Sequence, residues 1–170
     1  MHVEPAADAF AKRYAEGAPQ VVWTPLVADL ETPVSTFLKV AGGRPMSILL
    51  ESVEGGERFG RYSIIGLPVR RVATFRGHTL QIHDHGRLVE TRDVQDPFAE
   101  VEALRAAYAV PRLEGLPGFT GGLVGWFGFE CIGYIEPRLA NGGKPDELDT
   151  PDILLMQSEE VPVFDNLKGR

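Results

Sequence analysis

Apolar residues recur with helical spacing in three segments of the chain. In the first, residues 7–14, they fall every three or four positions on one face. The second begins at Thr32-Pro33, an N-cap residue followed by proline at the first helical position, and stops at Gly42. The third begins in the same way at Asp96-Pro97 and ends before Pro111. The pattern therefore predicts three short amphipathic helices.

The other apolar runs are short and bounded by turn-forming residues, which is typical of β-strands. The runs 72–76, 79–83 and 87–91 are separated only by tight turn sequences, so we expect an antiparallel meander. Further strands are predicted at 47–52, 62–66, 153–156 and 161–164. Pro162 restricts the last of these to a sheet edge or a bulge, because proline has no N–H to donate.

Several strands follow one another before the third helix begins, which excludes a doubly wound nucleotide-binding fold. The predicted fold class is α+β, a mostly antiparallel sheet with about three flanking helices. Residues 137–151 are rich in Gly, Pro, Asn and Asp and are predicted to form an exposed loop.

Composition and charge exclude several classes of function. With 170 residues, 44% of them hydrophobic, the chain is long enough for one domain with a substantial core. The net charge of -7 argues against a nucleic-acid partner, because phosphate backbones require clustered Lys and Arg. No apolar stretch approaches the roughly 20 residues of a membrane-spanning helix, so no membrane contact is expected. The single cysteine, Cys131, excludes an intrachain disulfide, and the expected location is the cytoplasm.

The strongest candidate for chemistry is the end of the strand around residue 50. Leu50, Glu51 and Ser52 precede a glycine-bearing acidic loop, and Arg61 follows that loop. A free amino acid needs acceptors for its ammonium group, donors for its carboxylate and an apolar surface for its side chain. Glu51, Ser52 and Arg61 could supply both signs at the end of an apolar strand. From the residues alone, the alternative is a strand that ends in polar residues because it reaches solvent.

Other candidate residues favour structural roles. The glycines among aromatic residues at 119–130 lack the lysine of a phosphate loop and predict close backbone packing. His83 and His85 are spaced like metal ligands, but no further ligands accompany them, and a solvated turn explains them. Cys131 is interpreted as a buried thiol, and the carboxylates of Glu159, Glu160 and Asp165 as a solvated sheet edge.

Several of these motifs occur together in one known family. Leu49-Leu50-Glu51-Ser52, the Phe-x-Gly-Gly-x-x-Gly signature starting at Phe119 and the closing Phe164-Asp165 resemble, in this order, the N-terminal region of anthranilate synthase component I, a chorismate-utilising enzyme. The resemblance implies that Ser52, Glu51, Leu50 and Arg61 bind L-tryptophan as a feedback inhibitor. It also implies that 1–170 is an N-terminal regulatory domain, whose allosteric control acts on a catalytic region absent from this chain.

The resemblance further implies an activity for the parent enzyme. That lyase converts chorismate and ammonia to anthranilate and pyruvate in tryptophan biosynthesis, with magnesium, and a glutamine amidotransferase subunit supplies the ammonia. We expect no catalytic residues, metal or cofactor within 1–170, and no turnover from it alone. The C-terminal catalytic region is then a partner, so we also expect self-association or a large exposed apolar patch.

Two other functions remain open. Aminodeoxychorismate synthase component I has the same architecture and a different product. A stand-alone amino-acid-binding module would belong to another class of protein, and calorimetry with tryptophan on this chain distinguishes it from a site that other residues complete.

Overall fold

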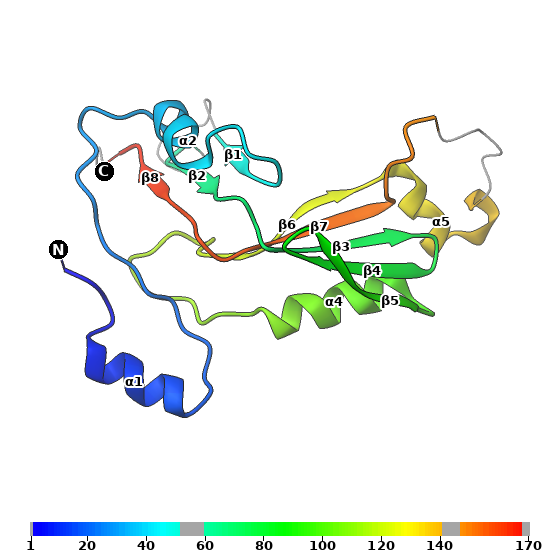
Figure 1. Cartoon of the computed structure of the whole chain (residues 1–170), viewed down its shortest axis with the longest axis horizontal. Coiled ribbons are helices and arrows are strands. Elements are labelled where there is room, and N and C mark those ends of the chain that lie inside the picture. The colour runs from blue at the N-terminus through cyan, green and yellow to red at the C-terminus, as the bar shows by residue number, and fades with distance from the viewer. Residues whose placement is uncertain (1, 52–59, 141–146, 168–170) are drawn as a thin grey trace. The chain divides into compact units, whose positions relative to one another are not determined.

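The computed structural model describes residues 2–51, 60–140 and 147–167, shown in Figure 1. The chain forms two compact units. The first combines residues 1–68, 109–122 and 158–170, and the second combines 69–108 and 123–157. Ser52, the residue that the resemblance marks first, lies outside the described residues. No helix within the described ranges is long and apolar enough to cross a membrane.

The first unit contains two helices and a small antiparallel sheet. The helices are α1 (Ala7–Ala15) and α2 (Pro33–Ala41). The strands are β1 (Ile48–Leu50), β2 (Tyr62–Gly66) and β8 (Val163–Asp165), with β2 in the centre of the order β1-β2-β8. The strand predicted at 161–164 lies at a sheet edge, as expected, but begins at Val163, so that Pro162 directly precedes it.

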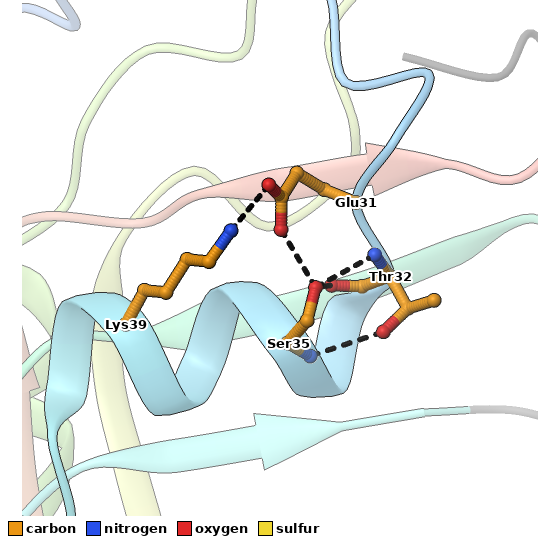
Figure 2. A network of polar contacts seen from close by, with 4 residues as sticks. All are labelled: Glu31, Thr32, Ser35 and Lys39. Carbon is orange, nitrogen blue, oxygen red and sulfur yellow. Dashed lines mark hydrogen bonds and ion pairs between the residues drawn. The ribbon is translucent and has the colours of Figure 1, made fainter.

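Helix α2 begins and ends where the sequence predicts. The Thr32 hydroxyl accepts a hydrogen bond from the Ser35 backbone N–H at 3.0 Å, and the Ser35 hydroxyl accepts one from the Thr32 N–H at 2.9 Å. Glu31 contacts both Ser35 and Lys39, which extends this capping box along the first turns (Figure 2). Gly42 closes the helix at φ 58°, a left-handed conformation that favours glycine.

The second unit is built on a five-stranded antiparallel sheet of order β5-β4-β3-β7-β6. Its strands are β3 (Arg71–Arg76), β4 (Thr79–Asp84), β5 (Arg87–Asp93), β6 (Gly122–Phe127) and β7 (Ile153–Ser158). The meander β3-β4-β5 is confirmed. His85 and Gly86 turn β4 into β5 with φ values of 50° and 73°, as a two-residue hairpin requires.

Helix α4 (Pro97–Ala107) lies along this sheet (Figure 1). Asp96 caps its first turn by accepting hydrogen bonds from two backbone N–H groups. The apolar face predicted for this helix packs against the core of the unit with three side chains, those of Phe98, Val101 and Leu104. Among the buried core residues, Phe75, Leu80 and Ile153 are completely inaccessible to solvent.

Strand β6 was not predicted as a strand. The sequence indicated close packing at its glycines, and this part is confirmed: a Cβ atom on Gly125 would lie 1.7 Å from the Leu154 carbonyl oxygen of β7. Three short helical turns follow, η1 (Phe129–Cys131), α5 (Ile132–Ile135) and η2 (Pro137–Leu139). Part of the loop predicted at 137–151 is therefore helical. The α+β class with antiparallel sheets is confirmed.

Candidate functional site

The candidate site lies where β1 ends and β2 begins, in the first unit. In the β1–β2 pair Leu50 is opposite Ile64, so Glu51 and Arg61 continue from the two strands toward the same end of the sheet. Arg61 is three positions from Ile64, a separation of about 10 Å along an extended strand. Leu50 is 49% exposed, and Glu51 is exposed as well.

The two faces of this sheet differ in burial. Ser63 and Ile65 point to one face and are 2% and 0% exposed. The opposite face carries a set of half-buried or exposed side chains that pair across all three strands, and we call it the open face. It consists of Leu50, Tyr62, Ile64 and Val163. An apolar surface of this kind suits the flat ring or aliphatic part of a small ligand.

Arg61 borders the open face and is held by Asp165 of β8. Its Nε donates to Asp165 Oδ1 at 3.1 Å and its Nη2 to Oδ2 at 2.8 Å, a two-pronged pairing. The side chains are 30% and 14% exposed. The guanidinium carbon also lies 4.9 Å from the ring centroid of Tyr62, within cation–π range. Asp165, interpreted from the sequence as part of a solvated edge, is thus largely buried by this contact.

Asn166 adds a second connection between β8 and the start of β2. Its side-chain Nδ2 donates to the Gly60 carbonyl at 3.2 Å and to the Ser63 hydroxyl at 3.1 Å. Its backbone N–H donates to the Arg61 carbonyl at 2.8 Å. Asn166 was not among the candidates drawn from the sequence. Residues this far apart in the chain become neighbours through the β2–β8 register, which no local motif specifies.

The arrangement combines opposite charges with an apolar surface. Glu51 offers a carboxylate, Arg61 a guanidinium that is already oriented, and the open face an aromatic and aliphatic platform. Of the four residues predicted for an amino-acid site, the structure places Leu50, Glu51 and Arg61 at one end of one sheet, while Ser52 lies outside the described residues. Tyr62, Asp165 and Asn166 were not predicted for this site.

The other candidates take structural positions. His85 lies in the β4–β5 turn with its Nδ1 2.6 Å from Asp84 Oδ1. Cys131 is buried, its thiol donates to the Asp152 carbonyl at 3.2 Å, and burial raises its pKa. Within the described residues, no group of three or more His, Cys, Asp or Glu is arranged to hold a metal ion.

Fold and site together define an α+β protein with a candidate site for a small zwitterionic ligand. Comparison with known proteins gives the family. The chain is 54% identical over 144 residues to anthranilate synthase component 1 of Pseudomonas aeruginosa, covering 85% of this chain and 29% of that protein. It is 52% identical over 144 residues to the same protein of Pseudomonas putida, covering 85% and 29%, and 49% identical over 148 residues to that of Neisseria meningitidis, covering 85% and 30%.

The chain is thus homologous to a part of anthranilate synthase component 1, and the resemblance drawn from its motifs is confirmed. The chain spans about 30% of the length of these relatives, which are named as an enzyme. A crystal structure of anthranilate synthase component I from Streptococcus pneumoniae matches with a TM-score of 0.49 and 22% identity, covering 87% of this chain and 30% of that one. No protein-family model matches the chain.

Proposed function

We propose that this chain is the tryptophan-sensing regulatory part of an anthranilate synthase component 1. Its homology to that enzyme supports the pathway, and the β1–β2 strand end supports the ligand. There Leu50 lies on the open face, Glu51 follows it in the chain, and Arg61, held by Asp165, precedes β2 at the same end of the sheet. This juxtaposition of charge and apolar surface is the observation that carries the proposal.

Each part of L-tryptophan has a proposed counterpart in the site. The ammonium group of tryptophan donates hydrogen bonds to the Glu51 carboxylate. The carboxylate of tryptophan accepts hydrogen bonds from Ser52 and from Arg61. The indole ring rests on the open face, where Leu50 and Tyr62 provide apolar area. Discrimination against smaller amino acids then arises from the apolar area that the ring buries, about 25 cal/mol per Å².

Regulation follows from a shift between two states of the whole enzyme. Tryptophan stabilises the state that binds chorismate poorly, and by linkage chorismate weakens tryptophan binding by the same factor. A coupling of about 1–3 kcal/mol is usual and corresponds to roughly 5- to 150-fold inhibition. The regulated reaction is the formation of anthranilate and pyruvate from chorismate and ammonia, carried out by a further region of the polypeptide with magnesium.

The proposed partners are that catalytic region and a glutamine amidotransferase subunit that delivers ammonia in the cytoplasm. Apolar side chains exposed in the second unit support contact with other protein. Phe129 is 88% exposed, Ile135 69% and Phe127 51%. Such side chains are normally covered in a complete assembly, and self-association of the isolated chain is the alternative way to cover them.

A chimaera tests the proposal. In the Pseudomonas aeruginosa relative, the matching 144-residue segment is replaced by that of this chain, and anthranilate formation is followed at increasing tryptophan. Glu51→Gln and Ser52→Ala are expected to raise the tryptophan concentration for half inhibition by at least about tenfold, the usual effect of losing a hydrogen bond to a charged group. Glu102→Gln, on the exposed face of α4, is the control and leaves inhibition unchanged.

Inhibition curves that are identical for Glu51→Gln, Ser52→Ala and the control would refute the proposed site. Calorimetry on the 170-residue chain adds a separate measurement. Weak or absent tryptophan binding fits a site completed by the catalytic region, whereas strong binding by the chain alone identifies a self-sufficient sensor module.

A further inference from the structure

The start of β2 is held in part by residues at the end of β8, about a hundred positions further along the chain. Asp165 binds the Arg61 guanidinium with both carboxylate oxygens, and Asn166 binds the backbone carbonyls of Gly60 and Arg61. The same Asn166 side chain reaches the buried hydroxyl of Ser63. We call Asp165 and Asn166 the β8 clasp.

A turn alone does not require these contacts. The local turn is already formed by the Leu167 N–H, which donates to Asp165 Oδ1 at 3.2 Å. The contacts to Arg61 and Gly60 span 104 and 106 positions of the chain and are additional to it. They fix both the backbone and the side chain at the point where the chain enters β2.

The geometry of the Arg61–Asp165 pair limits what Arg61 can do. The Nε and Nη2 edge of the guanidinium is occupied by the carboxylate, and the plane of the group lies over the ring of Tyr62. Two parallel charge-assisted hydrogen bonds orient a guanidinium far better than a single contact, because rotation about the side-chain bonds breaks both. Asp165 thus restricts the orientation of Arg61 at the border of the open face.

We propose that the β8 clasp positions the tryptophan site: Asp165 orients Arg61 toward the ligand carboxylate, and Asn166 fixes the backbone that carries Arg61. The inference rests on the function proposed above. Asp165 and Asn166 are positioning residues, and neither touches the ligand. The last residue of β8 and the residue after it therefore control the affinity of a site formed by β1 and β2.

The alternative role for Asp165 is that of a competitor. A carboxylate that occupies Arg61 also lowers the attraction of that guanidinium for a second carboxylate. If competition dominates, removal of the Asp165 charge strengthens tryptophan inhibition. If positioning dominates, the same change weakens it, because Arg61 then samples orientations that do not reach the ligand. The two roles predict opposite signs.

The experiment uses the chimaera described above, with the unmodified Pseudomonas aeruginosa relative as reference. Asp165→Asn removes the charge and keeps the shape, and Arg61→Lys keeps the charge and loses the two-pronged pairing. Each is expected to raise the tryptophan concentration for half inhibition about tenfold, and the double variant by no more than the larger single effect, because both break one interaction. Asn166→Ser replaces the side-chain amide and keeps the main-chain bond to Arg61, so it tests the contacts to the Gly60 carbonyl and the Ser63 hydroxyl with the same expected direction.

Rates without tryptophan and melting temperatures separate positioning from general stability. A positioning role weakens inhibition while the uninhibited kcat and the KM for chorismate change no more than in the Glu102→Gln control. Unchanged or strengthened inhibition in Asp165→Asn overturns the inference, as does an equal loss of uninhibited rate and inhibition. Absence of tryptophan inhibition in the unsubstituted chimaera, with the reference inhibited, refutes the proposed function itself and with it the clasp.

Discussion

Gly125 of β6 lies against the backbone of β7, so close that a Cβ atom on it would be 1.7 Å from the carbonyl oxygen of Leu154. Real Cβ atoms do not approach backbone atoms to this distance, and neither strand can yield without breaking the ladder between them. The glycine is therefore a requirement for the pairing of β6 with β7, the last strand pair of the five-stranded sheet.

Gly125→Ala is expected to destabilise the chain by about 3 kcal/mol, at the upper end of the usual cost of overpacking. Gly118→Ala is the matched control, because a Cβ atom there meets nothing within 4 Å. Urea unfolding followed by circular dichroism measures both. Equal midpoints for the two variants would show that β6 adjusts to the methyl group and does not need the close approach.

Local signals were sufficient to predict most of the elements. Helices α2 and α4 were identified from their N-caps at Thr32 and Asp96, and these side chains do accept the backbone hydrogen bonds of the first turn. The β4–β5 hairpin was identified from its turn residues, and His85 and Gly86 have the positive φ values that such a turn requires. In each case residues within a few positions determine the geometry.

Contacts between distant segments were not predictable in this way. Strand β6 was interpreted only as a packing segment, because its glycines obscure the strand pattern and its partner β7 lies far along the chain. The pairing of Arg61 with Asp165 depends on the register of β2 with β8. Of the candidate site, the sequence therefore indicated the residues near β1 but not those that β8 contributes.

Thr32→Ala tests the cap shown in Figure 2. The Thr32 hydroxyl accepts the Ser35 N–H at 3.0 Å, and its loss is expected to cost about 1 kcal/mol, the typical value for an N-cap. Thr36→Ala, in the same helix, removes a hydroxyl that makes no capping bond and replaces it with a better helix former. If both variants unfold at the same urea concentration, the cap contributes nothing measurable.

Cys131 is expected to react slowly with alkylating reagents while the chain is folded. Burial, and secondarily the nearby charge of Asp152, raises the pKa of its thiol, so the reactive thiolate is disfavoured at neutral pH. Because the pKa is raised in the folded state, its contribution to stability is present below the unfolded pKa of about 8.5 and is lost as pH rises through the folded value.

Iodoacetamide labelling at pH 8, read by mass spectrometry, is therefore expected to be at least about a hundredfold slower in buffer than in denaturing urea. The unfolded chain serves as the control for intrinsic reactivity. Equal rates under the two conditions would mean that the thiol is accessible and that η1 does not stay packed against Asp152.

Tyr134 of α5 connects that helix to the β3–β4 turn. Its hydroxyl lies 2.5 Å from Asp152 Oδ2 and 2.9 Å from the Gly77 carbonyl oxygen. Burial first, and the Asp152 carboxylate second, raise the pKa of this hydroxyl well above its usual value. Ionisation of Tyr134 is thus unfavourable in the folded state, because it places a phenolate against a carboxylate.

The sign of the pH dependence follows from that direction. The contribution of Tyr134 to stability is complete below the unfolded tyrosine pKa of about 10 and is lost as pH rises from there through the raised folded pKa. Tyr134→Phe is expected to lose about 1–2 kcal/mol at pH 7, the cost of removing a hydrogen bond to a charged group. It should also lose less stability than the unsubstituted chain between pH 9 and about 11.

Urea unfolding at pH 7, 9, 10 and 11 measures both effects, with Tyr14→Phe as the control. Tyr14 is 73% exposed in α1, so its substitution should leave the alkaline slope unchanged. A steeper alkaline loss in Tyr134→Phe than in the unsubstituted chain would contradict the raised pKa. An equal loss of stability at alkaline pH in Tyr134→Phe and Tyr14→Phe would assign the alkaline transition to other groups. The Tyr134 hydroxyl would then not limit stability at high pH.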